Sequence, residues 1–131
     1  MKNQNILLSF LVLSLTFFSF QCDEDAINNQ ESDEAELIAL KIEIESLANA
    51  SVCNESTECK FIAFGSKPCG GPWSYLIYST SIDTNKLEVM VEDYNQKEAD
   101  YNQKYGVGSD CSVALPPTSI TCENNTCVAV F

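Results

Sequence analysis

The sequence predicts an α+β fold in which two helices pack on a small, mainly antiparallel sheet, stapled by disulfides. Three observations lead to this prediction. Two stretches show helical periodicity, several short stretches are rich in β-branched and aromatic residues, and six cysteines lie within residues 36–131. We expect one domain, residues 36–131, preceded by two segments of different composition, residues 1–21 and 22–35.

The first predicted helix runs from about Glu34 to Asn49. Its apolar side chains recur at steps of three and four residues, which places them on one face of a helix. These residues are Leu37, Leu40, Ile44 and Leu47. The alternation of apolar and charged residues over 40–45 also fits a strand, but the length of the stretch and its lack of turn residues favour the helix.

Two short strands are predicted next, at 60–65 and 74–81, because both contain runs of aromatic and aliphatic side chains. Between them, the segment from Lys67 to Trp73 consists largely of proline, glycine and cysteine. Such residues form turns, so a tight loop should join the two strands.

The second predicted helix begins after Asp83, a good N-cap residue, and ends before Gly106, which suits the left-handed position that closes helices. The sequence Asp-Tyr-Asn-Gln-Lys occurs twice within it, at 93–97 and 100–104. A period of seven keeps the two tyrosines near one face. The expected buried stripe is Leu87, Met90, Val91, Tyr94, Tyr101 and Tyr105. A tyrosine-lined binding surface is the alternative.

The C-terminal part is predicted to form a weak strand at 112–115 and then a hairpin of 118–122 with 127–131. The hairpin should turn at Asn124 and Asn125, because asparagine tolerates the positive φ that two-residue hairpin turns need.

This hairpin register places Cys122 opposite Cys127 in a non-hydrogen-bonded pair, where the two residues are close enough for a disulfide. We therefore predict a Cys122–Cys127 bond. The simplest pairing of the remaining cysteines is Cys53 with Cys59 and Cys69 with Cys111, although sequence alone does not fix the connectivity.

Residues 1–21 have the composition of a secretory signal peptide, with a positive charge at Lys2 and an apolar run from Ile6 to Phe20. This run of 15 residues is shorter than the roughly 20 that a membrane-spanning helix needs. Cys22 follows almost directly. Removing it from the seven cysteines leaves an even six, as expected for a disulfide framework in an exported protein.

The segment Ser19-Phe20-Gln21-Cys22 resembles the lipidation site of bacterial lipoproteins, in the looser form found in Bacteroidota. The resemblance implies cleavage before Cys22, a lipid on its thiol, and the membrane as a partner through this anchor. Asp23-Glu24-Asp25 is similar to the acidic surface-export signal of such lipoproteins, which implies an outer-membrane location with exposure on the cell surface. A secreted protein without lipid and an uncleaved anchor are the alternatives. Residues 23–35 are acidic with few apolar side chains and are predicted to be a disordered tether.

Composition argues against several functions. The chain has a formal net charge of −12 and no arginine, which is unfavourable for binding nucleic acid. It contains no histidine, no Cys-x-x-Cys pair and no glycine-rich phosphate loop or calcium loop. The six domain cysteines are expected to be in disulfides, which leaves no thiolate nucleophile. We therefore expect no enzyme activity, no bound metal and no cofactor.

The candidate binding loop is Gly70-Gly71-Pro72-Trp73, which follows Cys69. One interpretation is a rigid loop that presents Trp73 to a protein partner, since tryptophan is enriched at binding hot spots. The interpretation we favour is a turn whose tryptophan covers the core. Cys69-Gly70-Gly71-Pro72, with Ser109-Asp110-Cys111 and Thr121-Cys122 followed by Cys127, loosely resembles small exported bacterial domains, a resemblance that implies no particular activity.

The sequence as a whole predicts a membrane-anchored exported lipoprotein with a non-catalytic binding or structural domain. A secreted or surface inhibitor of a hydrolase such as a protease is the alternative, because disulfides hold loops rigid enough for that role.

Overall fold

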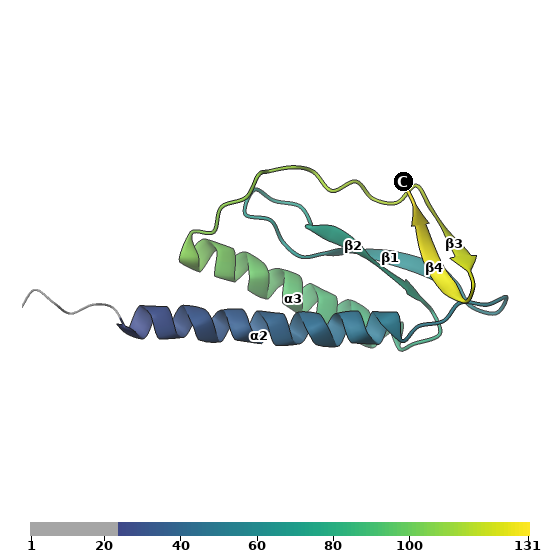
Figure 1. Cartoon of the computed structure of the whole chain (residues 1–131), viewed down its shortest axis with the longest axis horizontal. Helices are drawn as coiled ribbons and strands as arrows, with labels where there is room; N and C mark the ends of the chain where they lie inside the picture. Colours follow the sequence, from purple (N-terminus) through teal and green to yellow (C-terminus); the bar gives the residue numbers. More distant parts are fainter. Residues whose placement is uncertain (1–23) are drawn as a thin grey trace, which may run out of the picture.

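The computed structural model describes residues 24–131, and its elements confirm the predicted α+β class. Two long helices lie side by side, two short strands lie over them, and a hairpin lies at one end of these strands (Figure 1). The elements in chain order are α2 (Glu24–Asn49), β1 (Cys59–Phe64), β2 (Ser74–Ser79), α3 (Thr84–Tyr105), β3 (Ser119–Glu123) and β4 (Thr126–Val130).

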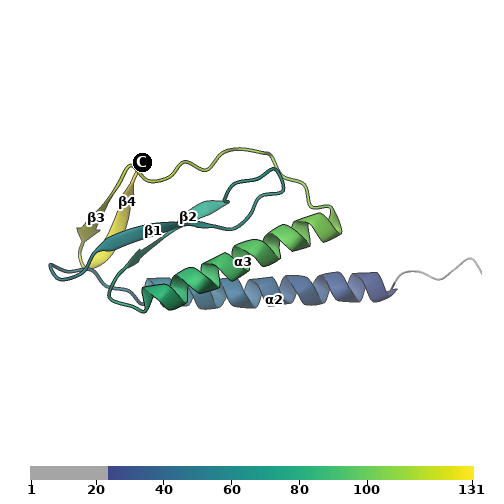
Figure 2. The same ribbon diagram turned by 180° about the vertical axis from the view of Figure 1, so that it is seen from behind.

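The four strands form two antiparallel two-stranded sheets, β1–β2 and β3–β4, where a single sheet was expected. Residues 107–118 return from α3 to β3 along the side of β1 and β2 that faces away from the helices (Figures 1 and 2). The weak strand predicted at 112–115 does not form; this segment has no regular secondary structure.

The core lies between the two helices and the inner face of the β1–β2 sheet. Its buried side chains are Ile44, Ala48, Phe64, Tyr78, Leu87, Val91 and Tyr94. Successive strand residues point to opposite faces, so Ile62 packs against this core while Phe61 faces outward and remains 40% exposed. The Phe61 ring lies edge-on to Tyr75, with the ring centroids 5.6 Å apart.

Both predicted caps of α3 are present. The Asp83 carboxylate accepts a hydrogen bond from the backbone N–H of Lys86 at 3.0 Å. Gly106 closes the helix in the left-handed region at φ 62°. The predicted stripe is buried at Leu87, Val91 and Tyr94, but Tyr101 and Tyr105 are only half-buried, and Asn102 is buried near this end instead.

Helix α2 begins at Glu24, so the predicted disordered tether at 23–35 is wrong for the residues that the structure describes. The Nζ atom of Lys104 lies 2.7 Å from an oxygen of Asp33, and that of Lys97 lies 2.8 Å from an oxygen of Glu36. The composition of this segment does not reveal these contacts, because the lysines that bind Asp33 and Glu36 lie on α3, 61 to 71 residues further along the chain. The domain therefore extends further toward the N-terminus than the predicted start at residue 36.

Three disulfides are present, but two of the three predicted pairings are wrong. Cys69 bonds to Cys111 as predicted, whereas Cys53 bonds to Cys122 and Cys59 to Cys127. The hairpin register is nevertheless as predicted, with Cys122 opposite Cys127.

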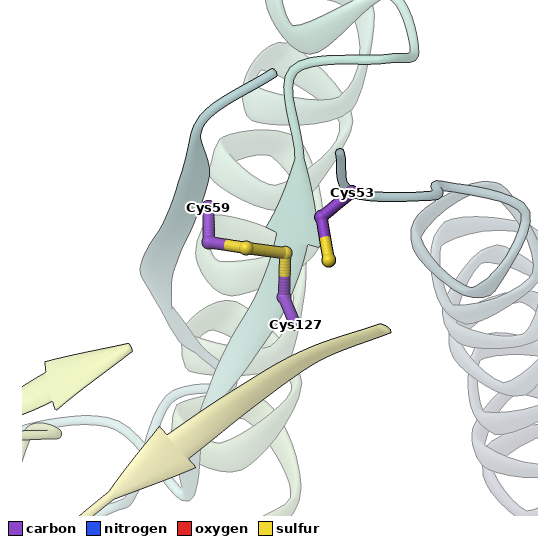
Figure 3. A group of neighbouring side chains, drawn as sticks. All are labelled: Cys53, Cys59 and Cys127. Atoms are coloured by element: carbon purple, nitrogen blue, oxygen red, sulfur yellow. A yellow bond between two sulfur atoms is a disulfide. The ribbon is translucent and has the colours of Figure 1, made fainter. Parts of the chain in front are cut away.

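The two hairpin cysteines have their side chains on one face of the hairpin, and each bonds to a cysteine from another part of the chain. Cys59, the first residue of β1, and Cys53, just after α2, lie within reach of that face (Figure 3). We call these two bonds, Cys53–Cys122 and Cys59–Cys127, the clasp. The turn asparagines, Asn124 and Asn125, have φ of 51° and 64°, as the predicted turn requires.

Candidate functional site

The predicted binding loop is a closed turn. The N–H of Lys67 donates to the carbonyl of Gly71 at 2.8 Å, and the N–H of Gly70 donates to the carbonyl of Lys67 at 2.9 Å. Gly70 and Gly71 have φ of 91° and 81°, a region that other residues rarely adopt. Both glycines are exposed, and a Cβ atom at either would meet nothing within 4 Å. The backbone turn, rather than close packing, explains the two glycines.

Helix α3 holds the chain just before this loop. The Asn95 amide accepts from the N–H of Gly65 at 2.7 Å and donates to the carbonyl of Ala63 at 3.1 Å. One turn and two turns further along the helix, Glu98 accepts from the N–H of Ser66, and Asn102 donates to the carbonyl of Ser66 at 2.7 Å. These three side chains lie on one face of α3 because their spacing is three and four residues.

Glu98 also accepts from the Tyr94 hydroxyl at 3.1 Å. Burial raises the pKa of Tyr94, and the nearby Glu98 carboxylate raises it further. Tyr94 therefore serves as a neutral hydrogen-bond donor that helps to orient Glu98 toward Ser66.

Sequence reasoning missed these polar residues, although the repeat in α3 contained the signal. Asn95 and Asn102 occupy the same position in the two copies, and so do Lys97 and Lys104. The asparagines bind the backbone at the end of β1 and just after it, while the lysines bind acids of α2. Two residues along a helix correspond to a rotation of about 200°. The asparagine and the lysine of each copy therefore lie on nearly opposite faces of α3, one toward the end of β1 and the other toward α2.

Lys67, at the start of the loop, binds residues of the segment that follows α3. Its side chain is buried, with 7% of the residue exposed. Its amine donates to the carbonyl and hydroxyl of Ser112 and lies 3.5 Å from Asp110. Hydrogen bonds from Ser112 and the charge of Lys67 hold the pKa of Asp110 below its usual value. Together with Cys69–Cys111, these contacts hold the start of the loop against residues 110–112.

Trp73 does not cover the core as predicted. It is 41% exposed and lies outside the buried cluster. The indole lies against Gly65, where an added Cβ atom would come within 2.6 Å of the Trp73 ring, and the amine of Lys67 lies 4.9 Å from the ring centroid. Trp73 also borders a pocket of about 280 Å³ that Leu37 and Tyr101 help to line. The indole therefore covers a glycine and a cation at the surface.

The largest hollow lies on another side of the loop, between β1 and α3. Its middle part, of about 950 Å³, is lined by residues from Ile62 to Ser66 and by α3 from Asn85 to Ala99. One end, of about 610 Å³, reaches the start of β3 and shares Ile62 and Glu88 with the middle. The other end, of about 520 Å³, shares Ala99 and reaches the binding loop at Pro68 and Gly70. We call these three neighbouring hollows together the β1–α3 groove; β1 and α3 lie on the near side in Figure 2.

Three sulfur atoms in the clasp, of Cys53, Cys59 and Cys127, lie within 4.8 Å of one another (Figure 3). Such a cluster has the spacing of metal ligands, but all three atoms are in disulfides. Metal ligation requires thiolates, so the cluster acts as a covalent link between the hairpin, β1 and the end of α2.

The predicted signal peptide, residues 1–21, and the predicted lipidation site, Cys22, lie outside the described residues. None of the helices in the described part of the chain is long and apolar enough to cross a membrane. Comparison with models of protein families, with curated proteins and with solved structures found no match.

Proposed function

We propose that this protein is an exported lipoprotein, held on the outer membrane by a lipid on Cys22, whose domain binds a protein partner without catalysis. The β1–α3 groove carries the proposal. Its three hollows neighbour one another, one of them reaches the loop that Cys69–Cys111 holds, and α3 is bonded to the chain just after β1. A preformed site of this kind loses little conformational freedom on binding.

Export is supported by the three disulfides, since such bonds form and persist in oxidising compartments. Anchoring is supported by the sequence around Cys22 and by the even number of cysteines that remain without it. We expect Cys22→Ser to stay at precursor size and to take up no labelled palmitate. Normal labelling of Cys22→Ser would contradict the anchor.

A binding role is supported over catalysis by the chemistry of the groove. The sequence has no histidine, and the six cysteines of the described part are all in disulfides. The Glu88 carboxylate in the groove is already bonded to the Tyr78 hydroxyl at 2.7 Å. The other ionisable side chains that line the groove are Glu92, Asp93, Lys60 and Lys67. Burial and Glu88 raise the pKa of Tyr78, so this pair is a neutral phenol on a carboxylate rather than a proton-transfer pair near neutral pH.

The test is capture of partners from cell envelope and medium with the full-length protein in detergent. Ala99→Trp places a large side chain where two parts of the groove meet, and Ala39→Trp adds the same side chain at an exposed site of α2 outside the groove. We expect Ala99→Trp to lose the proteins that both wild type and Ala39→Trp retain. An unchanged set of captured proteins would contradict a role for the groove.

A hydrolase inhibitor is the second function that the geometry supports, because the tip from Pro68 to Gly71 is exposed and pinned by Cys69–Cys111. The positive φ at Gly70 and Gly71 makes this tip a tight turn instead of an extended segment, so we place inhibition second. A panel of proteases assayed with wild type and with Gly70→Ala tests it. Inhibition that Gly70→Ala abolishes would place it first.

A further inference from the structure

Strand β1 has one unpaired edge, and that edge opens into the groove. Within residues 24–131, β1 pairs with β2 alone. In an antiparallel pair, alternate residues direct their N–H and C=O groups toward the partner strand. The carbonyl of Glu58 accepts from Thr80, and by this alternation Lys60 and Ile62 also face β2. The backbone groups of Phe61 and Ala63 therefore face away from β2.

The contacts of Asn95 confirm that the backbone groups at one end of this edge face away from β2. Its side-chain amide binds the carbonyl of Ala63 and the N–H of Gly65 together, as a peptide group of a neighbouring strand would. The same edge continues from Ala63 to Phe61 without such a side chain, past the hollow that Ile62 and Glu88 line. An added strand has room and backbone partners there.

The negative charge of the groove favours basic side chains on such a strand. Its middle part is lined by Glu88, Glu92 and Asp93 from α3 and by no lysine. Asp93 is paired with Lys97 at 3.3 Å, which leaves Glu88 and Glu92 as the two carboxylates without a cation among the described ion pairs. A bound segment with basic side chains on the α3 side would match them.

The face of β1 that points away from the helices favours apolar side chains on such a strand. Phe61 points away from the helices, is 40% exposed and meets Tyr75 edge-on. Side chains of an added strand alternate between the two faces. Basic residues toward α3 therefore alternate with apolar residues beside Phe61.

We propose that the β1–α3 groove binds an extended segment of a partner protein in which basic and apolar residues alternate, and that this segment pairs with the free edge of β1 as an additional strand. This inference rests on the proposed function, because it names the ligand class of the same groove. Main-chain hydrogen bonds supply affinity in this mode of recognition, and the alternating side chains supply specificity.

The probe is a fluorescent heptapeptide, Lys-Val-Lys-Val-Lys-Val-Lys, titrated against the full-length protein in detergent. One control has the same composition in blocks, Val-Val-Val-Lys-Lys-Lys-Lys, and the other replaces each lysine by glutamate. We expect the alternating peptide to bind about tenfold more tightly than either control, because only it matches both faces of the edge. Equal binding of the block peptide would mean attraction by charge alone and would overturn the proposal, as would no binding of the alternating peptide.

Strand addition has a separate signature. Exchange of the Phe61 amide hydrogen with solvent should slow at least tenfold at saturating peptide, whereas the amides of Lys60 and Ile62, which already face β2, should change little. Binding without protection of Phe61 would overturn the proposed pairing.

A matched pair of variants tests the acidic wall. Glu92→Lys reverses a charge that lines the groove, and Glu43→Lys makes the same change at an exposed site of α2 away from it. We expect about tenfold weaker peptide binding for Glu92→Lys and a change within about twofold for Glu43→Lys. Equal effects would overturn the assignment of the groove. If Ala99→Trp abolishes partner capture while the alternating peptide fails to bind, the proposed function stands and this inference alone fails.

Discussion

The two halves of helix α2 are attached to the rest of the molecule by different forces. In the second half, Ile44 and Ala48 are buried to 0% and 2% exposure against the core. In the first half, Glu31 and Glu36 are exposed and Asp33 is half-buried, and the contacts are ion pairs and hydrogen bonds to α3. One continuous helix therefore joins a segment fixed by hydrophobic packing to a segment fixed by surface charge.

This difference predicts which half of α2 withstands changes of salt and pH. Stabilisation by burial of apolar surface is not screened by salt and involves no titrating group, whereas exposed ion pairs contribute little and are screened by salt. The clasp adds covalent links at the buried end, since Cys53 follows α2 closely and bonds to the hairpin. The first half of α2 is therefore the more weakly held one.

The largest effect is expected from the clasp. Replacing both cysteines of Cys53–Cys122 by alanine should lower the free energy of unfolding by about 2–4 kcal/mol, the usual range for a disulfide. Removing Cys59–Cys127 as well should cost more than twice as much. While one bond remains, the long loop of 68 or 69 residues stays closed, so the first loss opens only a short extra loop. Denaturant unfolding of the two variants gives both numbers, and simple additivity would contradict this shared closure.

A second effect separates the two sides of α2. Ile44→Ala should lower the free energy of unfolding by about 2–5 kcal/mol, because it leaves a cavity in the core. Ile42→Ala, at a position that is 61% exposed, should stay within about 0.5 kcal/mol of wild type. Chemical denaturation measures both, and similar losses would mean that the two isoleucines are equally buried in solution.

The elements predicted correctly from sequence are those with local signals. Asp83 and Gly106 mark the ends of α3, and Asn124 with Asn125 marks the hairpin turn, because each acts through its own backbone conformation. The start of α2 was missed because residues 24–33 contain few apolar side chains, and their partner lysines are far away in sequence. The same limit applies to Cys122, whose disulfide partner lies 69 residues earlier.

The candidate site was predictable only in part. The tight turn follows from the sequence of the loop, whereas Cys69–Cys111 is correct only as the simplest remaining pairing, reached from a Cys122–Cys127 bond that does not form. The groove was not predictable, because it arises from an edge of β1 that a larger sheet would have covered. Trp73 was placed wrongly because its neighbour in space is Gly65, eight residues earlier and without a side chain.

Trp73 lies near the boundary between the two halves of α2, where it borders the same pocket as Leu37 and Lys41. Because it is 41% exposed, Trp73→Ala should cost about 1–2 kcal/mol, less than the roughly 3–5 kcal/mol of a fully buried aromatic. Phe131→Ala, at 78% exposure, is the control and should cost no more than about 0.5 kcal/mol. A loss as large as that of a buried aromatic would show that the indole is covered in solution.

The smallest effect should come from Asp33, and it is the one that isolates the charged half of α2. The hydrogen bond from Lys104 lowers the pKa of Asp33, and the Tyr105 hydroxyl lowers it further. A carboxyl whose pKa is lower in the folded state stabilises that state above its unfolded pKa, and this contribution is lost as the pH falls through the folded pKa. The first half of α2 should therefore lose helical signal below about pH 4, the ordinary aspartate range, while the buried half around Ile44 stays folded.

Circular dichroism between pH 7 and pH 2.5 measures this loss of helical signal. At pH 7, 1 M NaCl should reproduce the loss in part. Asp33→Asn should already show the reduced signal at pH 7, whereas Glu31→Gln, at an exposed position of the same helix, should behave as wild type. A wild-type signal from Asp33→Asn would mean that the contacts of Asp33 are not needed to hold the first half of α2.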